Sequence, residues 1–264
     1  MSLIENAKIL VRKWLPSRYG WSGDYNNWTE AMSHCVGYSD NLILEKVKAS
    51  TLKVKEGKAV FERDSVIFDH IEYSWPLLSS LLWVSAQNNS TIKVLDFGGS
   101  LGTSFFQNKL FLDKLKSVKW GVVEQENFVK CGKEFIENEQ LKFYYSIEEY
   151  IHENGLPDLL VLGCTIPYLQ NPYDLLDELK SYGIPYIIID DTPFNYENRD
   201  RLTVQKVPPS IYEASYPCWF LDYGKVISAI RPYEIVLEFL NESRIFLDGR
   251  PIRYRGMLAK FKSN

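Results

Sequence analysis

The chain has 264 residues, of which 45% are hydrophobic and 24% are charged. These proportions exclude a wholly disordered protein and allow one sizeable globular domain with an appended lobe. Thirty Lys and Arg against 34 Asp and Glu give a formal net charge of −4, so no sequence-independent binding to nucleic acid is expected. The four cysteines, at positions 35, 131, 164 and 218, form no C-x-x-C pair, which predicts a reduced, cytoplasmic protein.

The N-terminal segment predicts neither export nor a membrane span. Charges at Glu5, Lys8 and Arg12 interrupt the place of a signal peptide's apolar region. No apolar stretch in the chain approaches the roughly 20 residues that cross a bilayer. Apolar residues recur at helical spacing beside these charges, at Leu3, Ala7, Leu10 and Trp14. Such a helix suits either peripheral contact with a membrane surface or docking on the protein's own body.

Residues 1–90 are rich in aromatic side chains, which a mobile tail would not need. We expect them to form a helical cap over a sheet. From residue 91 onward, short apolar runs alternate with amphipathic stretches, which is typical of a parallel sheet covered by helices. The predicted strands are 93–97, 120–124, 141–145, 158–163 and 186–190, and the predicted helices are 104–115, 127–138, 147–154 and 173–182.

The alternation stops at residue 191. Residues 191–231 are rich in Pro, Tyr, Asn and Arg without a clean period, and we interpret them as a functional insertion. Two late strands follow, at 234–240 and 257–261, and the turn signal Asp248-Gly249 lies in the connection between them. The sequence therefore predicts an α/β protein with a Rossmann-like, mostly parallel, seven-stranded sheet and a late antiparallel hairpin.

The clearest local motif is an apolar strand that runs into a glycine-rich turn just before a helix. Its chemistry rests on Asp96, Gly98, Gly99, Ser100 and Gly102. Glycines at such a turn let a ligand approach main-chain N–H groups close to a helix N-terminus. The spacing departs from the dinucleotide pattern G-x-G-x-x-G, because a serine stands at position 100 and a threonine at position 103.

The next predicted strand ends in a glutamate. Glu124, which Gln125 follows, comes roughly 20 residues after the turn. Nucleotide-binding α/β folds place a carboxylate at this point to bind ribose hydroxyls. A carboxylate accepts hydrogen bonds from both vicinal hydroxyls, and its charge strengthens them. The alternative is a solvated glutamate at a strand end.

Together these residues resemble the first motif of class I S-adenosylmethionine-dependent methyltransferases, from which Ser100 departs because glycine is commoner there. The resemblance implies an adenine pocket at Ser146 and Ile147, although Ser146 also suits a helix N-cap. It also implies that Gly163 and Cys164, at the end of the fourth strand, lie near the transferred methyl group. A lone cysteine after an apolar strand is usually buried, so we do not expect a nucleophile.

Residues 19–31, 61–65 and 216–219 resemble a family of methyltransferases associated with surface-polysaccharide biosynthesis. This resemblance spans nearly the whole chain and implies methyl transfer to a saccharide or to its nucleotide- or lipid-linked precursor. It identifies no catalytic residue.

Methyl transfer to a hydroxyl needs positioning and a base. The candidates for the base are His70, which lies in a charged stretch of the cap, and Asp190 and Asp191, which end the fifth predicted strand. Two of them have a structural alternative: His70 can be a satisfied structural histidine, and Asp190 can cap the next turn. The histidines are scattered without ligand spacing, so no metal is expected.

The predicted acceptor-binding residues combine cationic anchors with aromatic platforms suited to a phosphate-bearing sugar. They are Tyr25, Trp28, Arg63, Tyr168, Arg199, Arg201 and Tyr216. Ordinary loop arginines and packing aromatics are the alternative. The sequence thus predicts a methyltransferase that uses S-adenosylmethionine, most simply an O-methyltransferase of a saccharide. The rival hypotheses are a nucleotide-sugar-binding oxidoreductase and a non-catalytic assembly partner, and the oligomeric state is left open.

Overall fold

The computed structural model describes residues 18–35, 40–209, 211 and 213–262. The predicted N-terminal amphipathic segment, 1–17, lies outside these residues. Within the described part of the chain, no helix combines the length and the apolar character that crossing a membrane requires.

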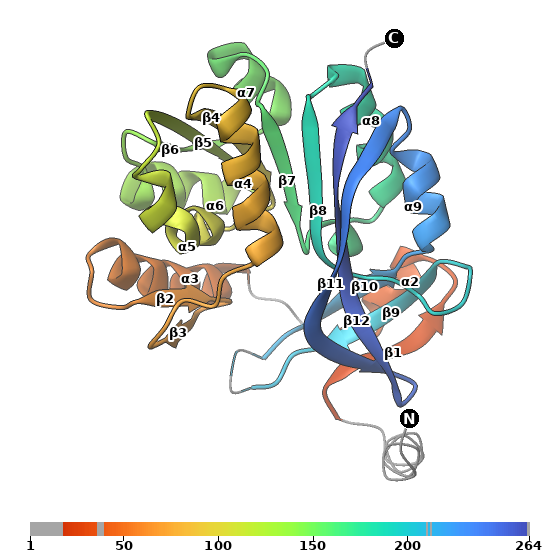
Figure 1. Ribbon diagram of the computed structural model, residues 1–264. Coiled ribbons are helices and arrows are strands. Elements are labelled where there is room, and N and C mark those ends of the chain that lie inside the picture. The colour runs from red at the N-terminus through yellow and green to blue at the C-terminus, as the bar shows by residue number, and fades with distance from the viewer. Residues whose placement is uncertain (1–17, 36–39, 210, 212, 263–264) are drawn as a thin grey trace.

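A seven-stranded sheet forms the centre of the molecule (Figure 1). Its strands, in spatial order, are β11 (Tyr233–Leu247), β12 (Arg250–Phe261), β8 (Tyr186–Pro193), β7 (Leu159–Gly163), β4 (Thr91–Phe97), β5 (Ser117–Val123) and β6 (Leu141–Tyr144). The five strands from β8 to β6 are parallel, whereas β12 runs antiparallel to both of its neighbours. The predicted Rossmann-like sheet with a late antiparallel hairpin is therefore confirmed.

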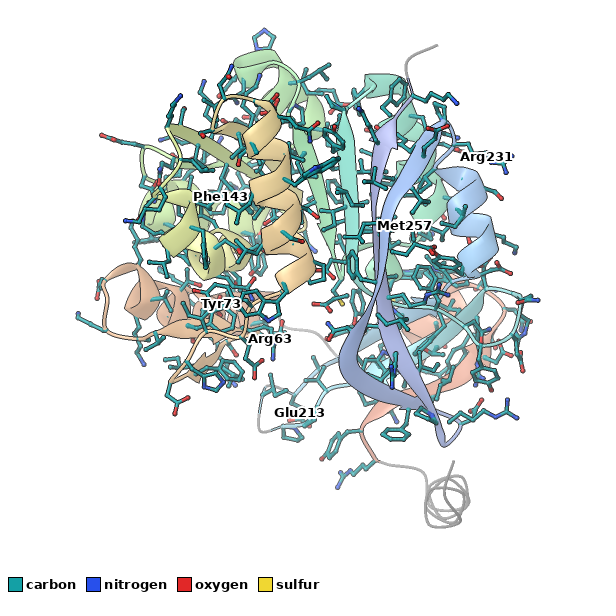
Figure 2. The ribbon with its side chains drawn as sticks, in the orientation of Figure 1. Arg63, Tyr73, Phe143, Glu213, Arg231 and Met257 are labelled. Carbon is teal, nitrogen blue, oxygen red and sulfur yellow. The ribbon has the colours of Figure 1, made fainter. Side chains whose placement is uncertain are left out.

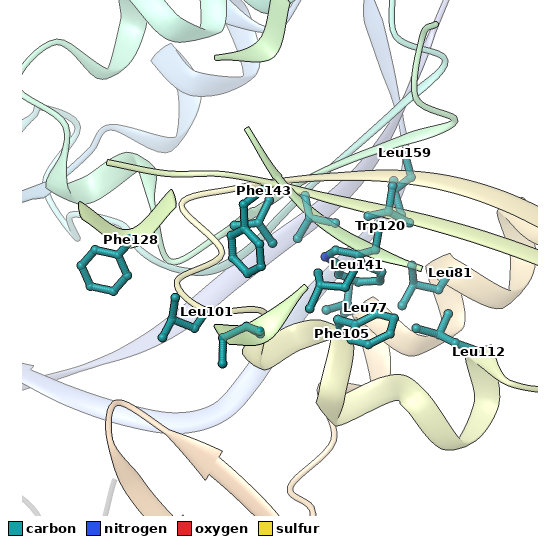
Figure 3. Packing of buried hydrophobic residues seen from close by; sticks show 14 of the residues in the cluster. Leu77, Leu81, Leu101, Phe105, Leu112, Trp120, Phe128, Leu141, Phe143 and Leu159 are labelled. Carbon is teal, nitrogen blue, oxygen red and sulfur yellow. The ribbon is translucent and has the colours of Figure 1, made fainter. Parts of the chain in front are cut away.

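Helices cover both faces of this sheet, which explains why its strands are almost continuously apolar. Along β4, Val94 faces one hydrophobic cluster and Leu95 faces the other. The first cluster, part of which Figure 3 shows, packs against α3 (Asp40–Lys55), α4 (Trp75–Gln87), α5 (Thr103–Leu112), α6 (Glu126–Cys131) and η1 (Gly132–Ile136). The second packs against α7 (Ile147–Asn154), α8 (Pro172–Tyr182) and α9 (Tyr223–Ala229).

The late hairpin is much longer than its apolar pattern suggests. Polar residues such as Asn241 interrupt the hydrophobic run, yet the ladder continues from Tyr233 paired with Phe261 to Leu247 paired with Arg250. The predicted turn is present, because Asp248 and Gly249 have φ angles of 50° and 76°, as a two-residue hairpin loop requires.

The predicted insertion contains regular structure that its irregular composition hides. β9 (Arg201–Lys206) and β10 (Ser215–Phe220) pair with each other, and β9 also pairs with β1 (Gly20–Tyr25) from the N-terminal segment. Leu202 and Val204 form the apolar face of this second sheet, and they are buried against α2 (Trp28–Ser33). The segment before β4 therefore contributes strands as well as the expected helices.

A short hairpin completes this N-terminal segment. β2 (Phe61–Arg63) and β3 (Val66–Phe68) are joined by Asp64 and Ser65. In the view of Figure 1 the carboxyl ends of β7 and β8 point downward, with the β2–β3 hairpin on the left and the three-stranded sheet on the right.

Gly256 permits close packing within the sheet. A Cβ at this position would lie 2.3 Å from the Phe239 ring and 2.5 Å from the carbonyl oxygen of Ile189. Gly256→Ala should therefore lower the free energy of unfolding by about 1–3 kcal/mol through overpacking, measured by urea denaturation. Arg253→Ala, an exposed change on the same strand, is the control and should have little effect. Equal stability of the two variants would contradict this packing.

Candidate functional site

The strand order creates a natural binding point at the carboxyl ends of β4 and β7. From β4 the chain proceeds outward through β5 and β6, and then returns to place β7 on the opposite side of β4. Open α/β sheets bind ligands where the order reverses in this way. The two strand ends are tied together here, because the Thr165 hydroxyl donates to the carbonyl of Phe97 at 2.9 Å.

The glycine-rich turn lies at this point and carries little side-chain bulk. Gly98, Ser100 and Gly102 have φ angles of 75°, 53° and 88°, a left-handed region that favours glycine. A Cβ at Gly98 would lie 2.5 Å from Thr165. Gly102 is the N-cap of α5 and offers no side-chain cap, so the first N–H groups of this helix keep hydrogen-bonding capacity for a ligand.

The Glu124 carboxylate is hydrogen-bonded to the glycine-rich turn. Its Oε1 accepts from the Ser100 N–H at 3.2 Å, and its Oε2 accepts from the Gln125 N–H at 2.7 Å. Burial raises the pKa of Glu124, and the two backbone hydrogen bonds oppose that rise. The Gln125 side chain is exposed.

Asp96 lies beneath the turn and is 2% exposed. Trp120 donates from Nε1 to its carboxylate at 3.3 Å. A Cβ at Gly99 would lie 2.5 Å from the same carboxyl group, so only glycine fits above it. Burial raises the pKa of Asp96 to about 7; the Trp120 hydrogen bond opposes this rise, and the charge of Glu124 adds to it.

Ser146 and Ile147 follow β6. The Ser146 hydroxyl accepts from the Glu149 N–H at 3.2 Å and caps α7, the role left open by the sequence. Ile147 is buried in the second hydrophobic cluster. Both residues lie at the carboxyl edge of the sheet, because β6 pairs with β5, the strand that Glu124 follows.

Cys164 follows Gly163 at the end of β7 and adopts a φ of 54°. Its N–H donates to the carbonyl of Asp190 at 3.0 Å, which joins the ends of β7 and β8. Burial raises the pKa of the Cys164 thiol well above its ordinary value, and the charge of Asp191 adds to the effect. A thiol held protonated in this way is a poor nucleophile.

Asp190 and Asp191 lie at the end of β8. The Ser74 hydroxyl donates to Asp190 at 2.6 Å, and Asp190 also accepts from the Asp191 N–H at 2.8 Å. The Asn241 amide donates to Asp191. Burial raises the pKa of both carboxyl groups, and the charge of Arg63 opposes the rise at Asp191.

The structure gives His70 and Arg63 different surroundings. The His70 side chain is 66% exposed, with its Nδ1 at 2.6 Å from Asp69 and its Nε2 at 3.9 Å from Glu72, both within its own segment. Arg63 donates to Glu72 at 2.8 Å, yet its charge also acts on Asp191. Figure 2 shows Arg63 on the side of the hairpin that faces the central sheet.

Arg199 and Arg201, two of the three arginines of the predicted acceptor site, are also engaged with carboxylates. Arg199 donates to both oxygens of Asp24, at 3.1 and 2.6 Å. Arg201 is 8% exposed, forms an ion pair with Asp248 and donates to the carbonyl of Gly23 at 2.9 Å. These contacts join β1, β9 and the β11–β12 turn, so a phosphate group would have to compete with them.

The predicted aromatic residues divide into two groups. Tyr25 and Trp28 pack against the small hydrophobic cluster beneath β9. Tyr168, in η2 (Ile166–Tyr168), follows β7 and donates to Gln205 at 2.8 Å. Its ring meets Tyr216 edge-on at 5.3 Å between centroids. Tyr168 and Tyr216 therefore link the end of β7 to the three-stranded sheet.

The sequence indicated Asp64 only as part of the resembling segment 61–65, and it did not single out Tyr254. The charge of Asp64 raises the pKa of both Cys164 and Tyr254, and Asp191 acts on the same two groups. The four residues come from the β2–β3 turn and from β7, β8 and β12, so their grouping depends on tertiary structure. The local signals for Asp64 were the turn-forming pair Asp64-Ser65 and its place in the resembling segment 61–65.

Two hollows of the described surface lie elsewhere. One lies beside β5, β6 and α7, and the other lies between α8 and α9. Neither is lined by Asp96, Glu124, Asp190 or Asp191, so the candidate site rests on the chemistry of the strand ends.

No family model and no curated protein matches the chain. Several solved structures are similar to it. The N-terminal domain of EvdMO1, crystallised in the presence of S-adenosylhomocysteine (SAH) and D-fucose, is 12% identical; the match covers 85% of this chain and 98% of that one, with a TM-score of 0.47. The N-methyltransferase NodS from Bradyrhizobium japonicum WM9, in complex with SAH, is 11% identical, with 80% and 99% coverage and a TM-score of 0.46.

A third similar structure is the 1,6-didemethyltoxoflavin-N1-methyltransferase of Burkholderia thailandensis. It is 12% identical, with 86% and 92% coverage and a TM-score of 0.43. Because these TM-scores are all below 0.5, the assignment of fold and chemistry rests on this chain's own strand order and side chains.

The raised pKa of Asp96 predicts a specific pH dependence of stability. Between the ordinary pKa of 3.8 and the folded-state value of about 7, the folded protein binds more protons than the unfolded chain, so its stability falls as pH rises. Asp96→Asn removes this pH-dependent loss. As the pH rises from 3.8 to about 7, the free energy of unfolding of the variant should therefore increase relative to wild type by on the order of 2–4 kcal/mol. Urea unfolding at pH 4.5 and pH 8 measures the gain.

Asp113→Asn is the matched control, since Asp113 is exposed and paired with Lys109 at 2.7 Å. Its stability relative to wild type should change little between the two pH values. A gain for Asp96→Asn that is the same at both pH values would contradict the assigned shift.

Proposed function

We propose that the chain is a methyltransferase that uses S-adenosylmethionine. The observation that supports this most strongly is the docking of the Glu124 carboxylate onto the amide of Ser100 at the point where the strand order reverses. The nucleoside part of a ligand at that point would lie beside Glu124, and the remainder would cross the thin glycine turn.

The residues present fit this cofactor. Each oxygen of Glu124 accepts one backbone hydrogen bond, and a carboxylate has about four acceptor positions. Two positions therefore remain for the vicinal hydroxyls of a ribose. The uncapped first turn of α5 supplies N–H donors for a carboxylate group. When bound, S-adenosylmethionine supplies an electrophilic methyl group on a sulfonium.

The charge of the site also suits a cationic methyl donor. Asp96, Glu124, Asp190 and Asp191 all have raised pKa values because they are buried. A ligand that brings positive charge near such groups stabilises their ionised forms. The site should therefore bind a sulfonium more readily than an anionic group.

For the acceptor we propose a hydroxyl of a saccharide, or of its activated or lipid-linked precursor, in surface-polysaccharide biosynthesis. This rests on the sequence resemblance carried by residues 19–31, 61–65 and 216–219. Carboxylates at the end of β8 and the tyrosine pair Tyr168 and Tyr216 offer hydrogen-bond acceptors and ring faces, the groups that bind sugars.

Isothermal titration calorimetry tests the cofactor directly. Purified protein should bind S-adenosylmethionine and SAH with micromolar dissociation constants, on the order expected for such small ligands, and should not bind NAD. Binding of NAD alone would favour the oxidoreductase. Folded protein that is free of co-purified ligand and binds neither would favour the assembly partner.

Glu124→Gln should weaken the binding of SAH by about 10- to 100-fold, because it removes the charge from hydrogen bonds to the ribose, each worth about 1.5–3 kcal/mol. Glu126→Gln is the control: Glu126 is two residues away, exposed, and paired with Lys130 at 2.5 Å. Equal affinities of the two variants would contradict the ribose assignment.

A further inference from the structure

The carboxyl end of β8 contains a β-bulge. Two consecutive residues of this strand, Asp190 and Asp191, lie opposite the single residue Gly256 of β12. Asp191 has a φ of 46°, a left-handed value that aspartate and asparagine adopt more readily than most residues. Bulges re-aim a side chain and are common beside active sites. The bulge therefore gives the Asp191 side chain a direction that a regular strand would not.

Asn241 of β11 holds the Asp191 carboxylate from across the hairpin. Its side-chain amide donates to Oδ1 of Asp191, although β12 lies between β11 and β8. Asn241 can make this contact because the β11–β12 ladder shifts its register between Leu240 and Arg244. Two irregular places in the sheet, one in β8 and one in β11, thus meet at a single carboxylate.

Hydrogen bonds connect the bulge to the glycine-rich turn. The Cys164 N–H, at the end of β7, donates to the carbonyl of Asp190 at 3.0 Å. The Thr165 hydroxyl donates to the carbonyl of Phe97, at the end of β4, at 2.9 Å. Neighbouring strands of a sheet lie about 4.8 Å apart. Asp191 therefore lies about one strand spacing from the end of β7 and about two from the end of β4.

The structure distinguishes the three bases that the sequence indicates. The His70 side chain is 66% exposed and pairs within its own segment. Asp190 is 4% exposed, and each of its oxygens already accepts a hydrogen bond. Asp191 is partly buried, and Asn241 occupies one of the roughly four acceptor positions of its carboxylate. Asp191 therefore combines a fixed direction with room for a ligand's hydroxyl.

We propose that Asp191 is the base that takes the proton of the acceptor's hydroxyl during methyl transfer, and that Asn241 positions it. This inference rests on the proposed function. The Asp191 carboxylate takes the hydroxyl proton while the acceptor oxygen bonds to the methyl carbon. The electron pair of the breaking carbon–sulfur bond stays on sulfur, so the sulfonium becomes a neutral thioether. Asp191 becomes a neutral acid, which then releases its proton to water.

The electrostatic surroundings suit this role. Partial burial raises the pKa of Asp191, whereas the hydrogen bond from Asn241 and the charge of Arg63 oppose the rise. The neighbouring carboxyl group of Asp190 is coupled to this site, because the charge of Asp191 raises its pKa. A carboxylate whose pKa is raised toward the working pH is a stronger base than an ordinary one.

A binding experiment tests the position of Asp191 without a known acceptor. Sinefungin carries a C–NH₃⁺ group in place of the S⁺–CH₃ group of the cofactor, so its ammonium lies where the methyl would be. The acceptor oxygen lies about 3 Å from the methyl group, and the base lies about 3 Å from that oxygen. The Asp191 carboxylate should therefore lie within about 6 Å of the ammonium.

Asp191→Asn should lower the affinity for sinefungin about fivefold or more, because the attraction between the two charges is lost. The affinity for SAH, which is neutral at sulfur, should change less than about twofold. Calorimetry measures both. Asparagine tolerates the left-handed φ and can still accept from Asn241, so the variant should fold, and its urea unfolding midpoint verifies this.

Two further variants complete the test. Asp177→Asn is the matched control, because Asp177 is largely exposed on α8 and paired with Lys180; both affinities should stay unchanged. Asn241→Ala removes the hydrogen bond that fixes Asp191. It should lower the ratio of sinefungin to SAH affinity by a smaller factor than Asp191→Asn, whereas a purely structural role would weaken both ligands equally.

The outcomes separate this inference from the proposed function. An unchanged ratio of sinefungin to SAH affinity in Asp191→Asn would overturn the assignment of Asp191, as would an equal loss of both ligands. A ratio that falls in Asp191→Asn but not in Asn241→Ala would overturn the positioning role of Asn241. Wild-type protein that binds neither ligand would instead overturn the proposed function, and the role of Asp191 with it.

Discussion

The hydrogen bond between the Glu124 carboxylate and the Ser100 amide is the contact on which the site depends. It joins the end of β5 to the turn that follows β4. A partly buried carboxylate is costly unless backbone donors compensate it, and the left-handed turn at Ser100 presents an amide to Glu124. Asp96, beneath Gly99, supports the same turn from below. The geometry of the strand ends thus follows from two buried acids and the glycines above them.

Two groups of elements surround the carboxyl ends of the parallel strands, one on each side. The β2–β3 hairpin brings Arg63 and Asp64 from one side, and η2 links the end of β7 to the β1–β9–β10 sheet through the bond between Tyr168 and Gln205. Ser74, just before α4, holds Asp190. The proposed acceptor would therefore meet side chains from segments far apart in sequence.

Local sequence patterns were sufficient to predict the parallel sheet and the glycine-rich turn after its first strand. Apolar strands, an N-cap serine at position 146 and the Asp248-Gly249 turn each depend on neighbouring residues, and the structure contains all of them. The β1–β9 pairing depends on contacts between residues about 180 apart, which no local period reveals. The same holds for Arg201, whose basic charge suggested a phosphate anchor, while Asp248 from the distant hairpin turn supplies its ion pair. The neighbours of Asp64 were hidden for this reason too.

Hydrogen–deuterium exchange with and without SAH locates the ligand on the chain. If SAH binds at the glycine-rich turn, exchange should slow in peptides that cover residues 98–105 and 124–126, and β11 should be unchanged. Protection confined to the hollow beside β5 and α7 or to that between α8 and α9, with none at the glycine-rich turn, would show that the cofactor does not bind at this edge of the sheet.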